Sequence, residues 1–380
     1  MRNLLQNPIK QVIVIKVGSH VFSREGRIVP KRIYALATQI CELAEHENQV
    51  LLVVSGAALA GRDIAGLDRA HYPRQLLRPL AALGQATLIA KCDQIFRRLN
   101  QPVGQVLVSR DDFHYRERYL AVKETVQALF KLHVLPIMNE NDSIGTAEQS
   151  LGDNDNLAAQ MAGMLDADLL IILGTVAGFH DGNPRDPASR VIPTVPEITP
   201  EIWRQGRFKG NRHSRGGMVA KLEAIGRANH CGIPVVLADG REEDILTRIF
   251  DGQEIGTLFM ASPQRLSLKK RWLAYSTRAA GQLIVDDGTC HALTRRGASL
   301  LSSGIIEVQG DFRAKEVVAV QSPTGTEFAR GIVNYDHETV RRIAGRNNRE
   351  LRSDPAGGEY REVVHRENIV LLPKAVKESK

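Results

Sequence analysis

Short apolar runs alternate with longer amphipathic stretches over about the first 260 residues. Six apolar runs have the length of a buried strand: residues 11–18, 49–56, 103–109, 133–138, 168–173 and 233–238. Helical patterns lie between or after them at residues 31–47, 76–99, 119–131, 155–165, 217–230 and 242–250. Strands that alternate with helices are typical of βαβ units, so the pattern predicts an α/β fold with a mainly parallel open sheet and helices on both faces.

The pattern changes in the last third of the chain. Short β segments with closely spaced glycines occur at residues 282–288, 304–312, 316–323 and 326–334, and helical patterns at 287–296 and 336–345. We expect a small, mixed, β-rich and barrel-like domain with its own core. The predicted organisation is a large domain at 1–261, a linker at 262–278, the small domain at 279–372 and a flexible tail at 373–380.

Composition supports this picture and excludes several classes of protein. A hydrophobic fraction of 43% and a charged fraction of 24% are ordinary for globular domains. No apolar run approaches the roughly 20 residues of a transmembrane helix, and the first residues lack the pattern of a signal peptide. We therefore expect a cytoplasmic protein. The net charge of +7 permits contact with nucleic acid without requiring it.

Cysteine and histidine spacings give no support for a transition-metal site. The four cysteines are far apart, and the eleven histidines include no HExxH pattern. We expect reduced, mostly buried thiols. The sequence does not exclude a site in which carboxylates and phosphate hold a hard cation.

Ligands of open α/β sheets bind outside the carboxyl ends of the strands. The loops at these positions read KVGSH, VSGAA, MNENDSIG, LGTVAGFHDG and ADGRE, and each is rich in glycine and small polar residues. Walker A is excluded because the chain has no Gly-Lys dipeptide, and the absence of any GxG excludes the dinucleotide fingerprint. Any nucleotide must therefore be bound by other means.

Four short segments carry candidate chemistry, and each also has a purely structural explanation. Lys16 ends the first strand and is a phosphate ligand or a lysine that snorkels to solvent. Ser55 and its small neighbours bind a ligand or only pack a turn. The dense Asn and Asp cluster at 139–156 exceeds what helix capping requires. A basic loop leads to Gly216 and Gly217 at a helix start, which is an anion site or a solvated loop.

In this order the segments closely resemble the glutamate 5-kinases, a branch of the amino-acid kinase family. The resemblance rests on KVGS, SGAALAGR, the Gly-Gln pair at 84 and 85, NENDS, GDNDNLAA, the GGM loop with Lys221, and LADGRE. The last third, from RAAGQLIVDDG to RRIAG, is similar to the PUA domain of many family members. The resemblance implies that ATP, with Mg²⁺, phosphorylates the side-chain carboxylate of L-glutamate in the first step of proline biosynthesis.

The resemblance also assigns roles to individual residues. Lys16 and Lys221 contact the nucleotide phosphates, and Asp155 lies between their ammonium groups. Glutamate contacts four residues, which are Ser55, Asp142, Asn154 and Asp153. The nucleotide contacts Lys16, Gly18, Ser19, Gly174, Thr175, Arg215, Gly216, Gly217, Met218 and Lys221. Proline is expected as a feedback inhibitor, and the chain is expected to form a homo-oligomer.

The departures from the family pattern lie on the nucleotide side. Gly174 and Thr175 stand where the family usually has Thr-Asp, and Arg215 replaces a threonine before the Gly-Gly-Met sequence. We expect a working kinase with altered nucleotide affinity or donor choice, since Arg215 can itself reach a phosphate.

Two other functions stay open at this point. The first is an inactive or weakened kinase homologue that acts in RNA binding or regulation. The second is an amino-acid kinase with a different acceptor, such as aspartate, acetylglutamate, carbamate or a nucleoside monophosphate.

Overall fold

The protein is described by a computed structural model that divides into two compact units, Met1–Leu266 and Ser267–Lys380. The structure describes residues 10–67, 74–144, 154–184, 186–206, 217–263, 265–275, 277–347, 350 and 362–372. Each unit contains its own cluster of buried apolar side chains.

The first unit is organised around an eight-stranded sheet with the order β5-β6-β4-β1-β7-β9-β10-β8. The six strands from β5 to β9 run parallel, whereas β10 is antiparallel to β9 and pairs in parallel with β8. The strands are β1 Val12–Val17, β4 Gln49–Val54, β5 Val103–Val108, β6 Leu135–Glu140, β7 Leu169–Gly174, β8 Thr194–Val195, β9 Val235–Asp239 and β10 Thr257–Phe259. A separate hairpin joins β2 Ser23–Arg24 to β3 Arg27–Ile28.

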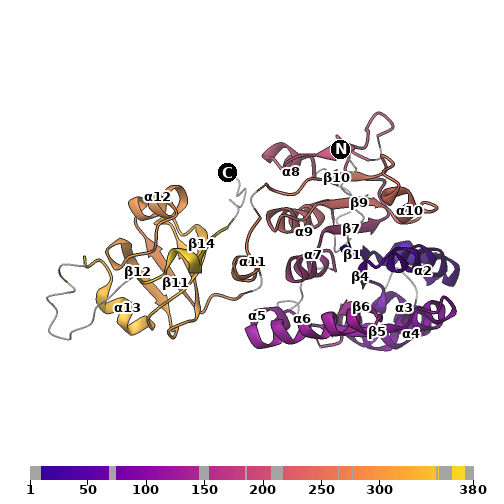
Figure 1. Ribbon diagram of the computed structural model, residues 1–380, viewed down its shortest axis with the longest axis horizontal. Coiled ribbons are helices and arrows are strands. Elements are labelled where there is room, and N and C mark those ends of the chain that lie inside the picture. The colour runs from indigo at the N-terminus through magenta and orange to yellow at the C-terminus, as the bar shows by residue number, and fades with distance from the viewer. Residues whose placement is uncertain are drawn as a thin grey trace. The chain divides into compact units, whose positions relative to one another are not determined.

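Helices cover both faces of this sheet (Figure 1). They are α1 Ser19–Phe22, α2 Pro30–Glu45, α3 Ala57–Ile64, α4 Leu77–Arg98, α5 Asp111–His114, α6 Arg116–Lys131, α7 Asn154–Leu165, α8 Pro200–Gly206, α9 Met218–His230 and α10 Ile245–Phe250. Alternate residues of β1, including Ile13 and Ile15, join one core with α2, α4 and α10. Because side chains alternate along a strand, Val14 and Lys16 face the opposite side, where α7 contacts β1.

The second unit has a five-stranded sheet with the order β12-β11-β13-β14-β15. Its strands are β11 Gly281–Val285, β12 Ile305–Gly310, β13 Val317–Gln321, β14 Glu327–Ile332 and β15 Ile369–Leu371, and its helices are α11 Leu268–Tyr275, α12 Asp287–Arg296 and α13 His337–Ile343. Aspartate side chains cap two of these helices, because Asp286 accepts from the Thr289 N–H and Asp336 from the Thr339 N–H.

The predicted fold class is confirmed, with a largely parallel sheet covered by helices and a separate β-rich unit. The expectation did not include α1, α3, α5, α8, β2, β3, β8, β10 or β15. Helix α11 lies inside the stretch predicted to be a linker, and the predicted tail at 373–380 lies outside the described residues. No helix among the described residues is long and apolar enough to cross a membrane.

Candidate functional site

A buried carboxylate joins two lysines at the carboxyl ends of the central strands. Lys16 Nζ lies 2.7 Å from Asp155 Oδ1, and Lys221 Nζ lies 2.6 Å from Asp155 Oδ2. The exposed fractions of the three side chains are 7% for Lys16, 14% for Lys221 and 1% for Asp155. One carboxylate thus holds two ammonium groups at the same point, although the three residues come from separate elements.

Local structure explains how these three side chains meet. Lys16 is the fifth residue of β1 and faces α7. Asp155 lies in the first turn of α7, where the helix dipole favours a negative charge. Lys221 lies one turn into α9, which packs against α7. The structure therefore brings together the three residues that were expected to form the catalytic group.

Asp155 is ionised in this arrangement. Burial alone would raise the pKa of its carboxyl group, but the charges of Lys16 and Lys221 outweigh burial and hold this pKa below its ordinary value. The group carries one more positive charge than negative charges when both lysines are protonated. It is therefore suited to a polyanion such as a nucleotide triphosphate.

Asn154, the first residue of α7, connects the neighbouring strands. Its Nδ2 lies within hydrogen-bonding distance of three acceptors, which share its two hydrogens: the Val54 carbonyl at 2.9 Å, Ser55 Oγ at 2.8 Å and Asn139 Oδ1 at 2.9 Å. Its Oδ1 accepts from the Glu140 N–H at 3.4 Å. The amide thereby fixes Ser55, at the end of β4, relative to the end of β6.

The hydrogen-bonded chain continues to α4. Asn139 Nδ2 donates to Gln85 Oε1 at 2.8 Å. Gln85 follows Gly84, where α4 crosses α3 so closely that a Cβ would lie 1.9 Å from the Ala57 carbonyl oxygen. Only glycine permits this approach, and the approach places Gln85 beside the Ser55 loop.

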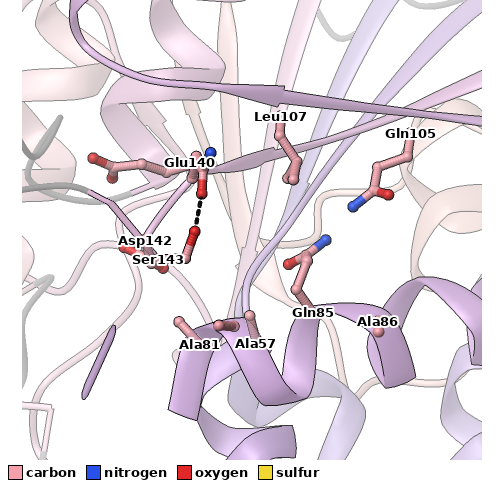
Figure 2. A pocket seen from close by; sticks show the side chains of 11 residues that line it. Ala57, Ala81, Gln85, Ala86, Gln105, Leu107, Glu140, Asp142 and Ser143 are labelled. Carbon is pink, nitrogen blue, oxygen red and sulfur yellow. Dashed lines mark hydrogen bonds between the residues drawn. The ribbon is translucent and has the colours of Figure 1, made fainter. Parts of the chain in front are cut away.

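A cavity of about 320 Å³ lies between α4, the end of β6 and the edge strand β5. It is lined by Ala57, Ala81, Ala82, Gln85, Ala86, Gln105, Leu107, Glu140, Asn141, Asp142 and Ser143. Figure 2 shows the amides of Gln85 and Gln105 on facing walls, with Asp142 and Ser143 at one end. The predicted glutamate ligand Asp142 therefore borders this cavity, and so does Ala57, two residues after Ser55.

Glycines shape the loops around the lysines. The Gly18 N–H donates to the Leu173 carbonyl at 2.9 Å, so this N–H is already used within the sheet. A Cβ on Gly18 would lie 3.8 Å from Lys16 Nζ, and a Cβ on Gly174 would lie 3.8 Å from Lys221 Cε. Ser19 begins α1 directly after Gly18. The backbone at these two glycines therefore passes close to the ends of both lysine side chains.

An ion pair that the sequence did not indicate stands on the predicted nucleotide side. Asp239 ends β9, opposite Gly174 of β7, and receives two hydrogen bonds of 2.9 Å from the backbone N–H and Nε of Arg241. Arg241 Nη2 also donates to the Thr175 carbonyl at 3.1 Å. Burial would raise the pKa of Asp239, but the hydrogen bonds from Arg241 lower it. The ion pair of Asp239 and Arg241 thereby connects the loop at Thr175 to the end of β9.

The remaining predicted residues lie either at the start of α9 or outside the described part of the chain. Gly217 and Met218 form the start of α9, one turn before Lys221. Asp153, Arg215 and Gly216 lie outside the described residues. Within the described part of the chain, no cluster of three His, Cys, Asp or Glu side chains could hold a metal ion.

The sequence matches the amino acid kinase family over residues 11–239 and the PUA domain over residues 281–354. A glutamate 5-kinase from Geobacter sulfurreducens is 37% identical over 374 residues, which cover 98% of this chain and 100% of that protein. A glutamate 5-kinase from Moorella thermoacetica is 38% identical over 364 residues, which cover 95% and 96% of the two chains.

The solved structures include carbamate kinase from Giardia lamblia bound to AMP-PNP, which superposes with a TM-score of 0.50. It is 15% identical, and the match covers 67% of this chain and 100% of that chain. At this identity, the likeness shows the shared fold alone.

Proposed function

We propose the following function from the premise that the chain belongs to the amino-acid kinase family and, within it, to the glutamate 5-kinases. It transfers the γ-phosphoryl group of ATP to the side-chain carboxylate of L-glutamate, which gives L-glutamyl 5-phosphate in the first step of proline biosynthesis. The observation that carries the proposal is the buried group of Lys16, Asp155 and Lys221, in a chain that aligns with glutamate 5-kinases along nearly its whole length.

The reaction needs no general base. A glutamate side chain with an ordinary pKa of about 4.3 is ionised at neutral pH. One of its oxygens forms the new bond to the γ-phosphorus, while the bond from this phosphorus to the β–γ bridging oxygen breaks. The electron pair of that bond leaves with ADP. The task for the protein is to bring two anions together and to stabilise the charge on the transferred group.

The two lysines perform this task from opposite sides. In our proposal Lys16 and Lys221 contact the phosphates, and Asp155 holds both ammonium groups in position without touching the transferred group. Because Asp155 prevents the lysines from moving apart, little reorganisation is needed during transfer. A bound Mg²⁺ would neutralise further phosphate charge, with the nucleotide supplying most of its ligands.

Glutamate is proposed to bind beside this group. Ser55 and Asn154 lie within one hydrogen-bonded network, and Asp142 lines the adjoining cavity. A carboxylate suits the α-ammonium of the substrate, whereas hydroxyl and amide donors suit its carboxylates. Asp153 is proposed as a fourth contact.

On the nucleotide side we propose contacts from the glycines and from the start of α9. Gly18, Ser19, Gly174 and Thr175 would contact one side of the nucleotide. The segment from Arg215 to Met218 would contact the other side. Backbone N–H groups at the start of a helix favour anions, which supports a phosphate at this end of α9.

Trapping the acyl phosphate with hydroxylamine tests the proposed reaction. The wild-type chain with L-glutamate, ATP and Mg²⁺ should form glutamyl hydroxamate. Lys16→Ala and Lys221→Ala should each lower kcat by at least about 100-fold, because each removes a preorganised cation. Lys131→Ala, which changes an exposed lysine at the end of α6, serves as the matched control and should leave kcat unchanged.

Undiminished product from both site variants would contradict the mechanism. An RNA-binding homologue without turnover would form no hydroxamate and would bind RNA with a strong dependence on salt. An enzyme for another acceptor would show its highest kcat/KM with aspartate, acetylglutamate, carbamate or a nucleoside monophosphate.

The remaining proposals concern partners and organisation. We propose a kinase domain at 1–261, a linker at 262–278 and a PUA domain at 279–372, in a cytoplasmic homo-oligomer that proline inhibits. Contact of the second domain with RNA is compatible with this proposal but is not required by it. Inhibition by added L-proline, and the mass in solution measured by light scattering, would test two of these points.

A further inference from the structure

A chain of hydrogen-bonded amides leads from Asn154 through Asn139 to Gln85, which lines the cavity, and backbone groups fix its orientation. Asn154 Nδ2 donates to the Val54 carbonyl, which can only accept, and Asn154 Oδ1 accepts from the Glu140 N–H, which can only donate. The orientation of the Asn154 amide is therefore determined at both ends by main-chain groups. It cannot rotate by 180° without losing both bonds.

The fixed orientation of the Asn154 amide determines the orientations of the Asn139 and Gln85 amides in turn. Asn154 Nδ2 faces Asn139, so Asn139 must present its oxygen there and direct its own NH₂ group to Gln85. Gln85 must then present Oε1 to Asn139. As a result, the NH₂ group of Gln85 is directed into the cavity, as the nitrogen of its side chain in Figure 2 shows.

The same constraint acts on Ser55 at the other end of the network. Its Oγ accepts from Asn154 Nδ2 at 2.8 Å, so the hydroxyl hydrogen is left to donate to another group. The network therefore presents two donors, the Ser55 hydroxyl and the Gln85 amide. Ala57, two residues after Ser55, lines the cavity together with Gln85.

We propose that Gln85 binds the α-carboxylate of the substrate, and that Asn139 is a positioning residue that sets the direction of the Gln85 amide. This inference rests on the proposed function. The side-chain carboxylate of glutamate must lie beside the group of Lys16, Asp155 and Lys221, where the phosphoryl group is transferred. The opposite end of the substrate carries the α-carboxylate and the α-ammonium.

The charges of the cavity agree with this orientation. Among the described residues, the ionisable ones that line it are the carboxylates Glu140 and Asp142, which favour the α-ammonium and would repel the α-carboxylate. The α-carboxylate therefore needs a donor away from these two groups. Gln85, on α4, supplies an N–H donor without bringing a further negative charge. A free acceptor oxygen at this position would work against binding.

A pair of substrates tests this assignment, because 4-aminobutyrate is glutamate without its α-carboxylate. The ratio of kcat/KM for L-glutamate to that for 4-aminobutyrate is measured for the wild type and for Gln85→Ala. A hydrogen bond to a charged group contributes roughly 10- to 100-fold, so the ratio should fall by this factor and the KM for glutamate should rise correspondingly. The KM for ATP should change by less than about twofold.

Gln127→Ala is the matched control, since Gln127 is exposed on α6 and is not among the residues that line the cavity. Its ratio should stay within about threefold of the wild-type ratio. Gln105→Ala is a comparison within the cavity, because Gln105 lines it from β5 but lies outside the amide chain, and its ratio should fall by less than that of Gln85→Ala. Asn139→Asp tests the positioning role. Aspartate accepts from Gln85 as well as from Asn154, so the Gln85 amide should reverse and turn its oxygen into the cavity. The ratio should then fall as in Gln85→Ala.

The possible outcomes separate this inference from the function on which it rests. An active wild type with an unchanged ratio in Gln85→Ala overturns the role of Gln85 and leaves the kinase reaction intact. A wild type that forms no glutamyl hydroxamate overturns both. An equal fall in Gln105→Ala and Gln85→Ala would show a general effect of the cavity wall and would also overturn the specific assignment.

Discussion

At the scale of single residues, the site depends on buried charged groups that each have an oppositely charged partner beside them. Removing a carboxylate or an ammonium group from water is costly unless a partner lies close by. Asp155 has two such partners at 2.6 and 2.7 Å. Each lysine in turn depends on the same aspartate, so the three charges form one unit whose members cannot be replaced independently.

Asp155→Asn should therefore affect both stability and activity. Breaking a buried ion pair costs about 3 to 5 kcal/mol, and the variant should lose this amount in urea unfolding at pH 7, together with most of its kcat. Because the pKa of Asp155 is lowered in the folded state, its contribution is present above the unfolded value of about 3.9 and is lost as the pH falls below it. The stability difference should accordingly be constant from pH 5 to pH 8.

A difference between wild type and Asp155→Asn that faded between pH 8 and pH 5 would contradict this explanation. Asp336→Asn is a suitable control, since Asp336 is an exposed carboxylate with a lowered pKa in the second unit. It should leave kcat unchanged.

Arg215 allows a second prediction at this scale. If its guanidinium contacts a phosphate, Arg215→Thr should raise the KM for ATP by at least about tenfold and change the ratio of kcat/KM values for ATP and GTP. Arg212→Thr alters a cation of the same loop and should have a smaller effect. Identical constants for wild type and Arg215→Thr would reject this role.

At the scale of elements, the contact of α3 with α4 decides where the substrate network lies. A Cβ on Gly84 would lie 1.9 Å from the Ala57 carbonyl oxygen and 2.2 Å from the Gly61 nitrogen, and a Cβ on Gly61 would lie 1.9 Å from the Leu80 carbonyl oxygen. The two helices therefore touch through their backbones at this crossing. Gln85 takes its position from this contact.

Gly84→Ala should push the helices apart. We expect a loss of about 1 to 3 kcal/mol in the free energy of unfolding and a raised KM for glutamate, because Gln85 and Ala57 would separate. Gly226→Ala, on α9, has only one ordinary contact, 3.7 Å from Ile198, and should be neutral or slightly stabilising. Thermal unfolding and steady-state kinetics check both variants, and a Gly84→Ala protein as stable as wild type would disprove the close crossing.

The elements also show what a sequence can predict. The parallel strands β1, β4, β5, β6, β7 and β9 were expected because each is a continuous apolar run between helical patterns. Strand β10 was not expected, since three residues are too few to show an alternation of apolar and polar side chains. Its direction depends on pairing with β9.

The candidate site, like the fold, could be predicted from the sequence only in part. Lys16 and the Asn and Asp cluster stand out by type and place, and the family resemblance supplies their grouping. The bond from Asn139 to Gln85 joins residues 54 positions apart and has no local signal. The ion pair of Asp239 and Arg241 could have been suspected from LADGRE at a strand end, but its bond to the Thr175 loop depends on the order of strands in the sheet.

At the scale of the whole molecule, the two units have separate cores. The apolar cluster of the first unit includes residues from Ile13 to Leu258, and that of the second includes residues from Leu283 to Ile369. Lys16, Asp155, Lys221 and the network to Gln85 all belong to the first unit. We therefore expect that neither the folding of this unit nor the chemistry of its site requires the second core.

A chain that ends at Leu266 should accordingly form glutamyl hydroxamate with a kcat/KM within about threefold of the full-length value. Its thermal unfolding should be cooperative, because it retains a complete core. A truncated protein that unfolds cooperatively but has lost its activity would show that the second unit contributes to catalysis.

The grouping of Lys16, Asp155 and Lys221 also affects when the site can form during synthesis of the chain. At roughly 5 to 20 residues per second, about 7 to 28 seconds separate the synthesis of Lys16 from that of its partner Asp155 on the ribosome. During this interval the first strands emerge with an ammonium group whose counter-charge has not yet been made. The nascent sheet therefore cannot complete its burial around β1, and the active centre closes only when α7 and α9 have left the exit tunnel.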